Sequence, residues 1–298
     1  MYEKTPCALL MTGLVAISMA ISAHATEGGG SMYPNGIESF NLAAVPPVPG
    51  TYLLLYGVHD EADRLMDNNG DRVPVDFSLR ATAIIPRFVE VTPWHLLGGQ
   101  PVFHVIAPLV DLDVRLNGKS DSRQGLGDMV LGGGLAYHLS QNLQSVIALD
   151  VFAPTGQYDK NRLANIGRHY WSAEPVLGVS YLQRWGINAD LKVMYDFNGL
   201  NDATDYRSGQ ELHADFDLGW GFNNGWKVGV GGYVYQQTTA DRQYGNTVPD
   251  SRGRAMALGP TVIFDAGKWF VSVKYQKEFG VRNRPEGDGL IVKAAFPL

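Results

Sequence analysis

Cysteine is almost missing from this sequence, which has a single one, Cys7, among 298 residues. Cys7 precedes an apolar run from Ala8 to Ala20 that ends close to Ala23-His24-Ala25, a pattern typical of a cleaved secretory signal peptide. We therefore predict a signal peptide over residues 1–25 and a mature chain without cysteine. Small secreted scaffolds depend on disulfides, so that class of protein is excluded.

Long apolar runs and basic patches are also missing after the predicted signal peptide. A helical membrane span needs about 18 to 20 apolar residues in a row, and no later stretch offers them. The net charge is −6 at pH 7, and without a basic patch we expect no nucleic-acid partner. The motifs G-x-S-x-G and H-E-x-x-H are missing too, so we predict no catalytic residues, no cofactor and no enzyme activity.

Metal-ligand spacings do not occur either. The histidines after the predicted signal peptide are scattered, whereas zinc sites show short intervals between ligands: His59, His95, His104, His138, His169 and His213. Asp67-Asn68-Asn69-Gly70-Asp71 resembles the start of a calcium loop, but Arg72 stands where such a loop needs Gly. We predict a plain external loop there and no metal site in the chain.

Strict alternation of apolar and polar residues is the strongest pattern that is present. It runs over Glu211 to Phe222, Trp226 to Gln236 and Trp269 to Glu278, with Asn- or Gly-containing turns between some of the runs. A period of two belongs to β-strands, and runs of about ten residues match the length that a tilted strand needs to cross a bilayer. Strands of soluble sandwiches are shorter, about five or six residues. The pattern predicts an all-β protein, a transmembrane antiparallel up-and-down β-barrel.

The barrel is expected over residues 51–298, with about twelve strands, although ten or fourteen remain open. Long polar connectors, expected at 60–73, 116–125, 154–168, 198–208, 238–252 and 280–287, alternate with shorter ones, which is the loop pattern of outer-membrane barrels. This alternation puts both chain ends on the periplasmic side. The expected strands are 51–59, 74–90, 101–115, 126–138, 143–153, 169–182, 187–197, 209–222, 226–237, 253–264, 269–279 and 288–297.

The polar faces of these strands should point into the barrel and the apolar faces toward outer-membrane lipid. An Arg or Lys at the bilayer midplane costs about 2–4 kcal/mol, so ionised side chains are disfavoured on the lipid face. The predicted lumen-lining residues are Asp76, Arg80, Glu174, Asp190, Lys192, Asp196, Glu211, His213, Asp215, Asp217, Lys227, Lys274 and Glu278.

Residues 26–50 are rich in Gly and Pro and show no useful periodicity. Proline removes a ladder donor, so this segment is not a central strand. Two interpretations stay open: a flexible periplasmic tail, or a plug that folds into the barrel. In the second case the apolar side chains expected inside are Met32, Tyr33, Ile37 and Phe40.

A set of short motifs in a fixed order resembles a known family, the proteins named after the meta-pathway of phenol degradation. The motifs are Glu27-Gly-Gly-Gly30, Tyr33-Pro34-Asn35-Gly36, Pro49-Gly50-Thr51-Tyr52, Gly125-Leu126-Gly127-Asp128, Pro154-Thr155-Gly156-Gln157-Tyr158, Tyr206-Arg207-Ser208-Gly209 and Gly259-Pro260. The resemblance implies a barrel in the cell outer membrane, allied to channels for hydrophobic compounds. It also implies that the N-terminal segment is a plug and that there are no catalytic residues to carry over.

The function favoured by the pattern and the resemblance together is a channel for passive uptake of hydrophobic or aromatic small molecules. The alternatives are a general porin for polar solutes, a barrel with a filled structural core and, less favoured, an outer-membrane enzyme that modifies lipids. The sequence carries no signal for the oligomeric state.

Overall fold

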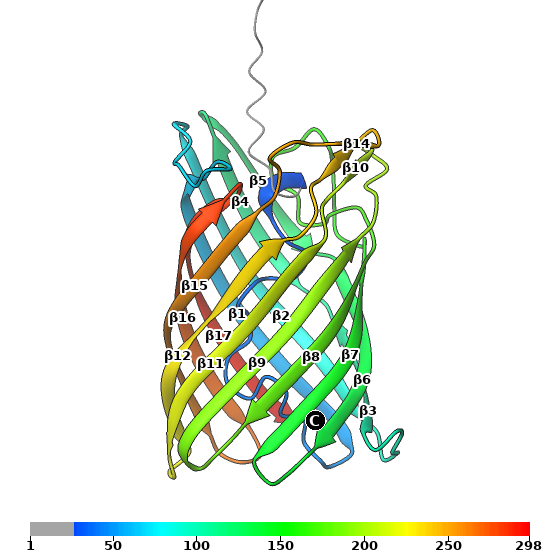
Figure 1. Ribbon diagram of the computed structural model, residues 1–298, viewed down its shortest axis with the longest axis vertical. Coiled ribbons are helices and arrows are strands. Elements are labelled where there is room, and N and C mark those ends of the chain that lie inside the picture. Colours follow the sequence, from blue (N-terminus) through cyan, green and yellow to red (C-terminus); the bar gives the residue numbers. More distant parts are fainter. Residues whose placement is uncertain (1–26) are drawn as a thin grey trace, which may run out of the picture.

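The computed structural model describes residues 27–298, which form one closed antiparallel β-barrel (Figure 1). A 3-10 helix, η1 (Glu27–Gly29), precedes the barrel. Strand β1 (Gly50–Leu65) pairs with the last strand, β17 (Pro285–Pro297), and on its other side with β2 (Phe77–Val91). The pairing of first and last strands closes the ring, which satisfies backbone groups that lipid could not.

The other strands lie antiparallel to their neighbours along the chain. The wall continues with β3 (Gln100–Ile106), β4 (Leu109–Leu116), β5 (Lys119–Leu126), β6 (Met129–His138), β7 (Leu143–Ala153), β8 (Ser172–Tyr181), β9 (Trp185–Asn198), β11 (Glu211–Phe222), β12 (Trp226–Gln237), β15 (Arg254–Asp265) and β16 (Phe270–Arg282). A small second sheet in the loops contains β10 (Tyr206–Arg207), β13 (Arg242–Gln243) and β14 (Asn246–Thr247).

Two of the wall spans are broken into two strands each. Strands β3 and β4 continue each other across Ala107-Pro108, and β5 and β6 across Gly127-Asp128. At the break the Gly127 N–H donates to the Pro108 carbonyl at 2.8 Å. Within residues 27–298 the fourteen strands of the large sheet therefore make twelve spans, and the predicted fold class is confirmed.

Two of the predicted long loops are instead continued strands. The connector expected at 116–125 is a tight turn at Asn117-Gly118, where φ is 50° and 78°, and β5 follows at once. Positive φ at both central residues of a hairpin favours an Asn-Gly pair. The connector expected at 280–287 is likewise reduced to Asn283-Arg284, between β16 and β17. The polar residues that suggested loops belong to strand ends that extend beyond the lipid.

The outward face is apolar over the middle of the barrel. Leu218 is 54% exposed and Val271 is 36% exposed, which excludes two stacked sheets with these side chains in a dry centre. Aromatic side chains gather at the rim with the short turns, where Trp185 lies 6.1 Å from Trp220 and Trp226 lies 4.9 Å from Phe264, centroid to centroid. An aromatic girdle of this kind marks a membrane interface.

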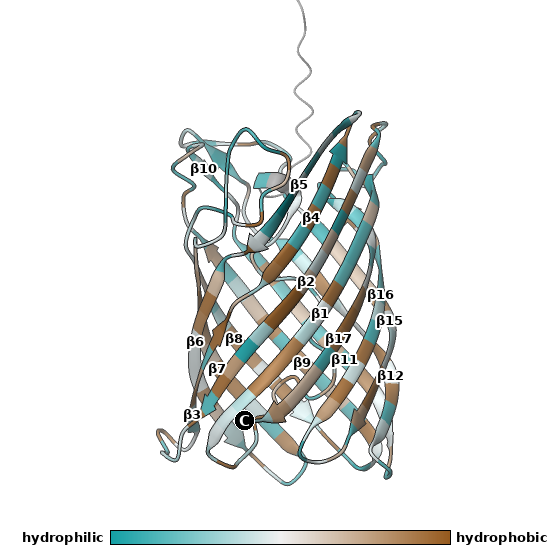
Figure 2. Ribbon diagram, turned by 180° about the vertical axis from the view of Figure 1, so that it is seen from behind, coloured by the Kyte–Doolittle hydropathy of each residue, from teal (hydrophilic) through white to brown (hydrophobic). Residues whose placement is uncertain are grey.

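The polarity of the two faces is reversed near the long-loop rim, which carries the loops after β1, β7, β9 and β12. Strands β4 and β5 are rich in hydrophilic residues near this rim (Figure 2), and Asp111, Asp113 and Arg115 of β4 are exposed. Asp76 and Arg80 were predicted to line the lumen, and that prediction was wrong. Both are exposed on the outside, where Arg80 pairs with Glu61 at 3.1 Å and Asp76 with Arg115 at 3.2 Å. These strand ends project past the bilayer, so water and not lipid lies outside them.

Within the described residues, the structure has no helix that is long and apolar enough to span a membrane. The predicted signal peptide, residues 1–25, lies outside the described residues.

The reversal can be tested with two variants, one with an arginine on the outward face at membrane level and one with an arginine on the outward face above the membrane. Val230→Arg on β12 should lower the free energy of unfolding by about 2–4 kcal/mol, because Val230 faces the hydrocarbon. Ser78→Arg on β2 should change it by less than about 1 kcal/mol, since this outward position lies in water. Urea unfolding in phospholipid vesicles measures both, and an equal loss in the two variants would contradict the assignment.

Candidate functional site: an interior cavity above the N-terminal segment

The segment before β1 runs through the inside of the barrel, from the long-loop rim to the short-turn rim (Figure 1). At the first end, Glu27 accepts hydrogen bonds from the Tyr158 hydroxyl at 2.7 Å and the Asn201 amide at 2.6 Å. At the other end, the Val48 carbonyl accepts one from the Tyr52 hydroxyl at 2.8 Å. Tyr33, Ile37 and Phe40 are buried in between, and Met32 packs against the same core.

Asp215 on β11 holds the middle of this segment. Its carboxylate accepts hydrogen bonds from the Tyr33 hydroxyl at 2.7 Å, from the Gly36 N–H at 2.9 Å and from the Glu38 N–H at 3.2 Å. A carboxylate that accepts backbone N–H groups satisfies donors that a strand would otherwise pair with its neighbours. The irregular segment therefore stays in place without joining the sheet.

Glu38 is the segment's own charged contact with the wall. Its carboxylate lies 2.8 Å from Lys293, 3.3 Å from Arg87 and 4.0 Å from Lys192, and all four side chains are largely or fully buried. Lys274 also donates to the Glu38 backbone carbonyl. Buried charges are tolerated when they are paired and hydrogen-bonded, so the acid of the segment and the bases of the wall stabilise each other.

The structure places most predicted lumen residues on the inner face, several of them covered by the N-terminal segment. Asp76 and Arg80 are the exceptions described above. Glu278 is half-buried beside a cavity. The other predicted residues are all buried and point inward: Glu174, Asp190, Lys192, Asp196, Glu211, His213, Asp215, Asp217, Lys227 and Lys274.

A cavity of about 660 Å³ lies between the N-terminal segment and the long-loop rim. Met32, Tyr33 and Pro34 line it from the segment, and Asp60, Glu278 and Asp288 form a polar side. Its main wall is apolar and comes from the inner faces of β2 and β4: Phe77, Leu79, Ala81, Ala83, Ile85, Val110, Leu112, Val114 and Leu116. The arrangement suits a small, mostly apolar guest that meets a few polar groups on one side.

A smaller cavity of about 80 Å³ continues below, between the segment and the wall. Met32 and Ile85 line both cavities, and Ile106 and Phe152 line only the lower one. Charged side chains also line the lower cavity, among them Glu38 and Arg87. The ion pairs that hold the segment therefore border the lower cavity, directly below the upper one.

The loop after β7 closes the cavity beside β5, whose other edge pairs with no strand among the described residues. The Asp121 carboxylate accepts hydrogen bonds from the Arg162 guanidinium and from the Leu163 and Ala164 N–H groups, the last two at 3.0 Å. The hydrogen bonds from Arg162 lower the pKa of the Asp121 carboxyl. The loop is thus held by an ionised group outside the membrane.

Two of the motifs, Gly125–Asp128 and Pro154–Tyr158, meet at this loop. The Asp128 carboxylate accepts hydrogen bonds from the Gly156 N–H at 2.8 Å and from the Arg168 N–H at 2.7 Å. Gly156 and Gly167 lie so close that a Cβ on Gly167 would stand 2.5 Å from the Gly156 carbonyl carbon. The motif residues therefore fix the loop to the break between β5 and β6.

Sequence reasoning missed the apolar inner wall. The signal was present, because Val110, Leu112 and Val114 alternate strictly with Asp111, Asp113 and Arg115. Alternation separates two faces of a strand but does not say which one is inside. The assignment needs the height of the strand relative to the bilayer, which only the closed barrel defines.

The geometry defines an outer-membrane β-barrel whose interior is partly filled by its own N-terminal segment. Comparison with known proteins agrees with this class of protein. Residues 62–294 match the model of a family described as the putative MetA-pathway of phenol degradation. The match covers well over half of the chain, so the chain belongs to this family, as the resemblance predicted. No curated protein matches it.

A solved structure of an outer membrane channel shows the same fold. The COG4313 outer membrane channel from Pseudomonas putida F1 is similar with a TM-score of 0.71 and 19% sequence identity, covering 88% of this chain and 100% of that chain. The translocator domain of the autotransporter NalP from Neisseria meningitidis has a TM-score of 0.48 at 10% identity, covering 84% and 89%. The CymD monoaromatic hydrocarbon channel has 0.46 at 10%, covering 93% and 98%.

Removing the negative charge of Glu38 should weaken the attachment of the N-terminal segment to the barrel wall. Glu38→Gln leaves Lys293, Arg87 and Lys192 without their buried partner, and breaking such a pair costs about 3–5 kcal/mol. We expect a lower thermal midpoint and a higher single-channel conductance in planar bilayers. Glu90→Gln, which changes an exposed carboxylate on β2, is the control and should behave as the wild type. Unchanged conductance and stability in Glu38→Gln would show that these ion pairs do not hold the segment.

Asp121→Ala should free the loop that closes the cavity, because the Arg162 guanidinium and the Leu163 and Ala164 N–H groups lose their acceptor. We expect faster cleavage between residues 159 and 166 in limited proteolysis of the detergent-solubilised barrel. Asp113→Ala removes an outward-facing carboxylate from the adjacent strand and should leave the cleavage rate unchanged. Equal rates in all three proteins would argue against this anchor.

Proposed function

We propose that this protein is a channel for the passive uptake of hydrophobic or aromatic small molecules across the outer membrane. The observation that carries the proposal is the apolar inner wall of the 660 Å³ cavity on β2 and β4. The lumen of a water-filled porin is polar, because its solutes are hydrated. An apolar wall favours a guest that leaves water readily.

The route starts at the long-loop rim, which faces outside in barrels of this class. A guest would first occupy the upper cavity and then pass between the wall and the N-terminal segment, next to Met32 and Ile85. Passage requires this segment to move, so the segment is the plug of the channel. Net uptake would follow the concentration gradient of the solute, because passive transport is not coupled to an energy source.

Two further points belong to the same proposal. The similar COG4313 protein is an outer membrane channel, which supports transport and not catalysis for this chain, whatever the family description says of degradation. Export by a cleaved signal peptide over residues 1–25 would deliver the chain to the outer membrane, where lipid covers its apolar outer face.

The test is uptake of radiolabelled toluene, phenol and naphthalene, with arginine and glucose as polar solutes, by cells with and without the protein. Leu112→Asp places a charge in the apolar wall, and we expect uptake of the aromatics to fall about tenfold, the equivalent of 1.4 kcal/mol. Asp113→Asn, one residue along on the outward face, is the matched control and should leave uptake unchanged.

Other outcomes would point elsewhere. Rapid passage of arginine and glucose, unaffected by Leu112→Asp, would favour a general porin. Aromatic uptake that does not depend on the protein, together with no permeability of any solute in liposome swelling, would indicate a barrel with a filled structural core.

A further inference from the structure

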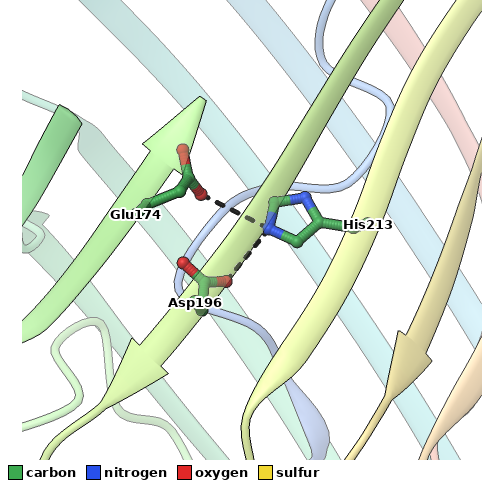
Figure 3. A group of neighbouring side chains, drawn as sticks. All are labelled: Glu174, Asp196 and His213. Carbon is green, nitrogen blue, oxygen red and sulfur yellow. Dashed lines mark hydrogen bonds and ion pairs between the residues drawn. The ribbon is translucent and has the colours of Figure 1, made fainter. Parts of the chain in front are cut away.

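Three neighbouring strands each contribute one side chain to a buried cluster on the inner face. The cluster consists of Glu174 on β8, Asp196 on β9 and His213 on β11. Figure 3 shows one ring nitrogen of His213 facing both carboxylates. This Nε2 atom lies 3.0 Å from Asp196 Oδ2 and 3.3 Å from Glu174 Oε2, and all three side chains are 0% exposed.

The negative charge of the cluster is poorly compensated. Within residues 27–298, the ion pairs found for Glu174 and Asp196 are both with His213. Both oxygens of Glu174 and one oxygen of Asp196 are buried without a hydrogen-bond partner, and so is Glu211 Oε2 on the same strand as His213. One proton on Nε2 cannot satisfy two carboxylates. Glu38, by contrast, is met by three cations.

The spacing of the three atoms suits a metal ion. One oxygen of each carboxylate and one nitrogen of the ring lie within 4.8 Å of one another. Ligands at 2.0–2.2 Å from Zn²⁺ stand roughly 3–3.5 Å apart when their angles are near tetrahedral. The two nitrogen–oxygen distances fall in that range or at its edge. A divalent cation would also neutralise both carboxylates, which costs less than leaving them buried and charged.

We propose that Glu174, Asp196 and His213 form a Zn²⁺ site in the wall of the barrel, with water in the fourth position. This departs from the sequence prediction of no metal site, which rested on spacing along the chain. The ion would tie β8, β9 and β11 together directly behind the N-terminal segment. The Tyr33 ring packs on the His213 ring with centroids 4.9 Å apart, so the site also supports the residue that Asp215 holds.

The site is sealed, so the metal should enter during folding and exchange slowly afterwards. The test therefore uses the chain isolated from outer membranes, and the same chain unfolded in urea with chelator and refolded in detergent with ZnCl₂, CoCl₂ or MgCl₂. Bound metal is measured by elemental analysis after desalting. Bound Co²⁺ is also followed by its visible absorption, which reports ligation by nitrogen and oxygen.

We expect about one Zn²⁺ or Co²⁺ per wild-type chain, no retained Mg²⁺, and a higher thermal midpoint with Zn²⁺ than without. Glu174→Gln and His213→Gln should retain less than a tenth of the metal and lose the Zn²⁺-dependent shift. The control is Asp217→Asn, because Asp217 is another buried, unpartnered carboxylate of β11 that lies outside the cluster. It should bind metal as the wild type does.

Refolded wild-type protein that retains less than a tenth of an equivalent of Zn²⁺ and shows no Co²⁺ absorption would overturn the proposal, and His213 would then be an ion-paired side chain only. The metal content of the wild-type protein tests the Zn²⁺ site even if Glu174→Gln fails to fold. The measurement involves no transport, so the Zn²⁺ site can fail while the proposed uptake function stands, and the reverse.

Discussion

The pairing of β1 with β17 is the constraint on which the rest of the structure depends. In lipid, each backbone N–H and C=O needs a partner inside the protein, and a sheet achieves this only by closing. Closure separates an outer face that meets lipid from an inner face that lipid never reaches. Ionisable residues such as Asp215 and Lys293 can then be buried inside a membrane protein, provided that they find partners there.

The N-terminal segment supplies many of those partners. Asp215 of the wall accepts N–H groups of the segment, and Glu38 of the segment meets Lys293 and Arg87 of the wall. The charges of the inner face thus serve to hold an irregular peptide that cannot join the sheet. The cluster of Glu174, Asp196 and His213 lies in the same wall, and its unmatched charge is the reason to place a cation there.

Above the lipid the same closed sheet faces water, and the preference of each face changes. Arg80 and Asp113 turn outward, while Leu79 and Leu112 turn inward and form the apolar wall of the cavity. A barrel that is polar inside at membrane level and apolar inside above it offers an apolar molecule its most favourable position near the long-loop rim. In the proposed uptake, such a molecule would meet the N-terminal segment next.

The sequence by itself determined the period of the strands, the approximate number of spans and the apolar outer face at membrane level, because alternation and run length are local properties of the chain. The motif order also indicated the family. Only the tertiary structure decided the rest. It set which face of 77–84 and 109–116 is inside, since a period of two does not distinguish them, and it placed residues 27–49 within the barrel. Glu174, Asp196 and His213 became neighbours because strand register joins residues that sequence spacing leaves far apart.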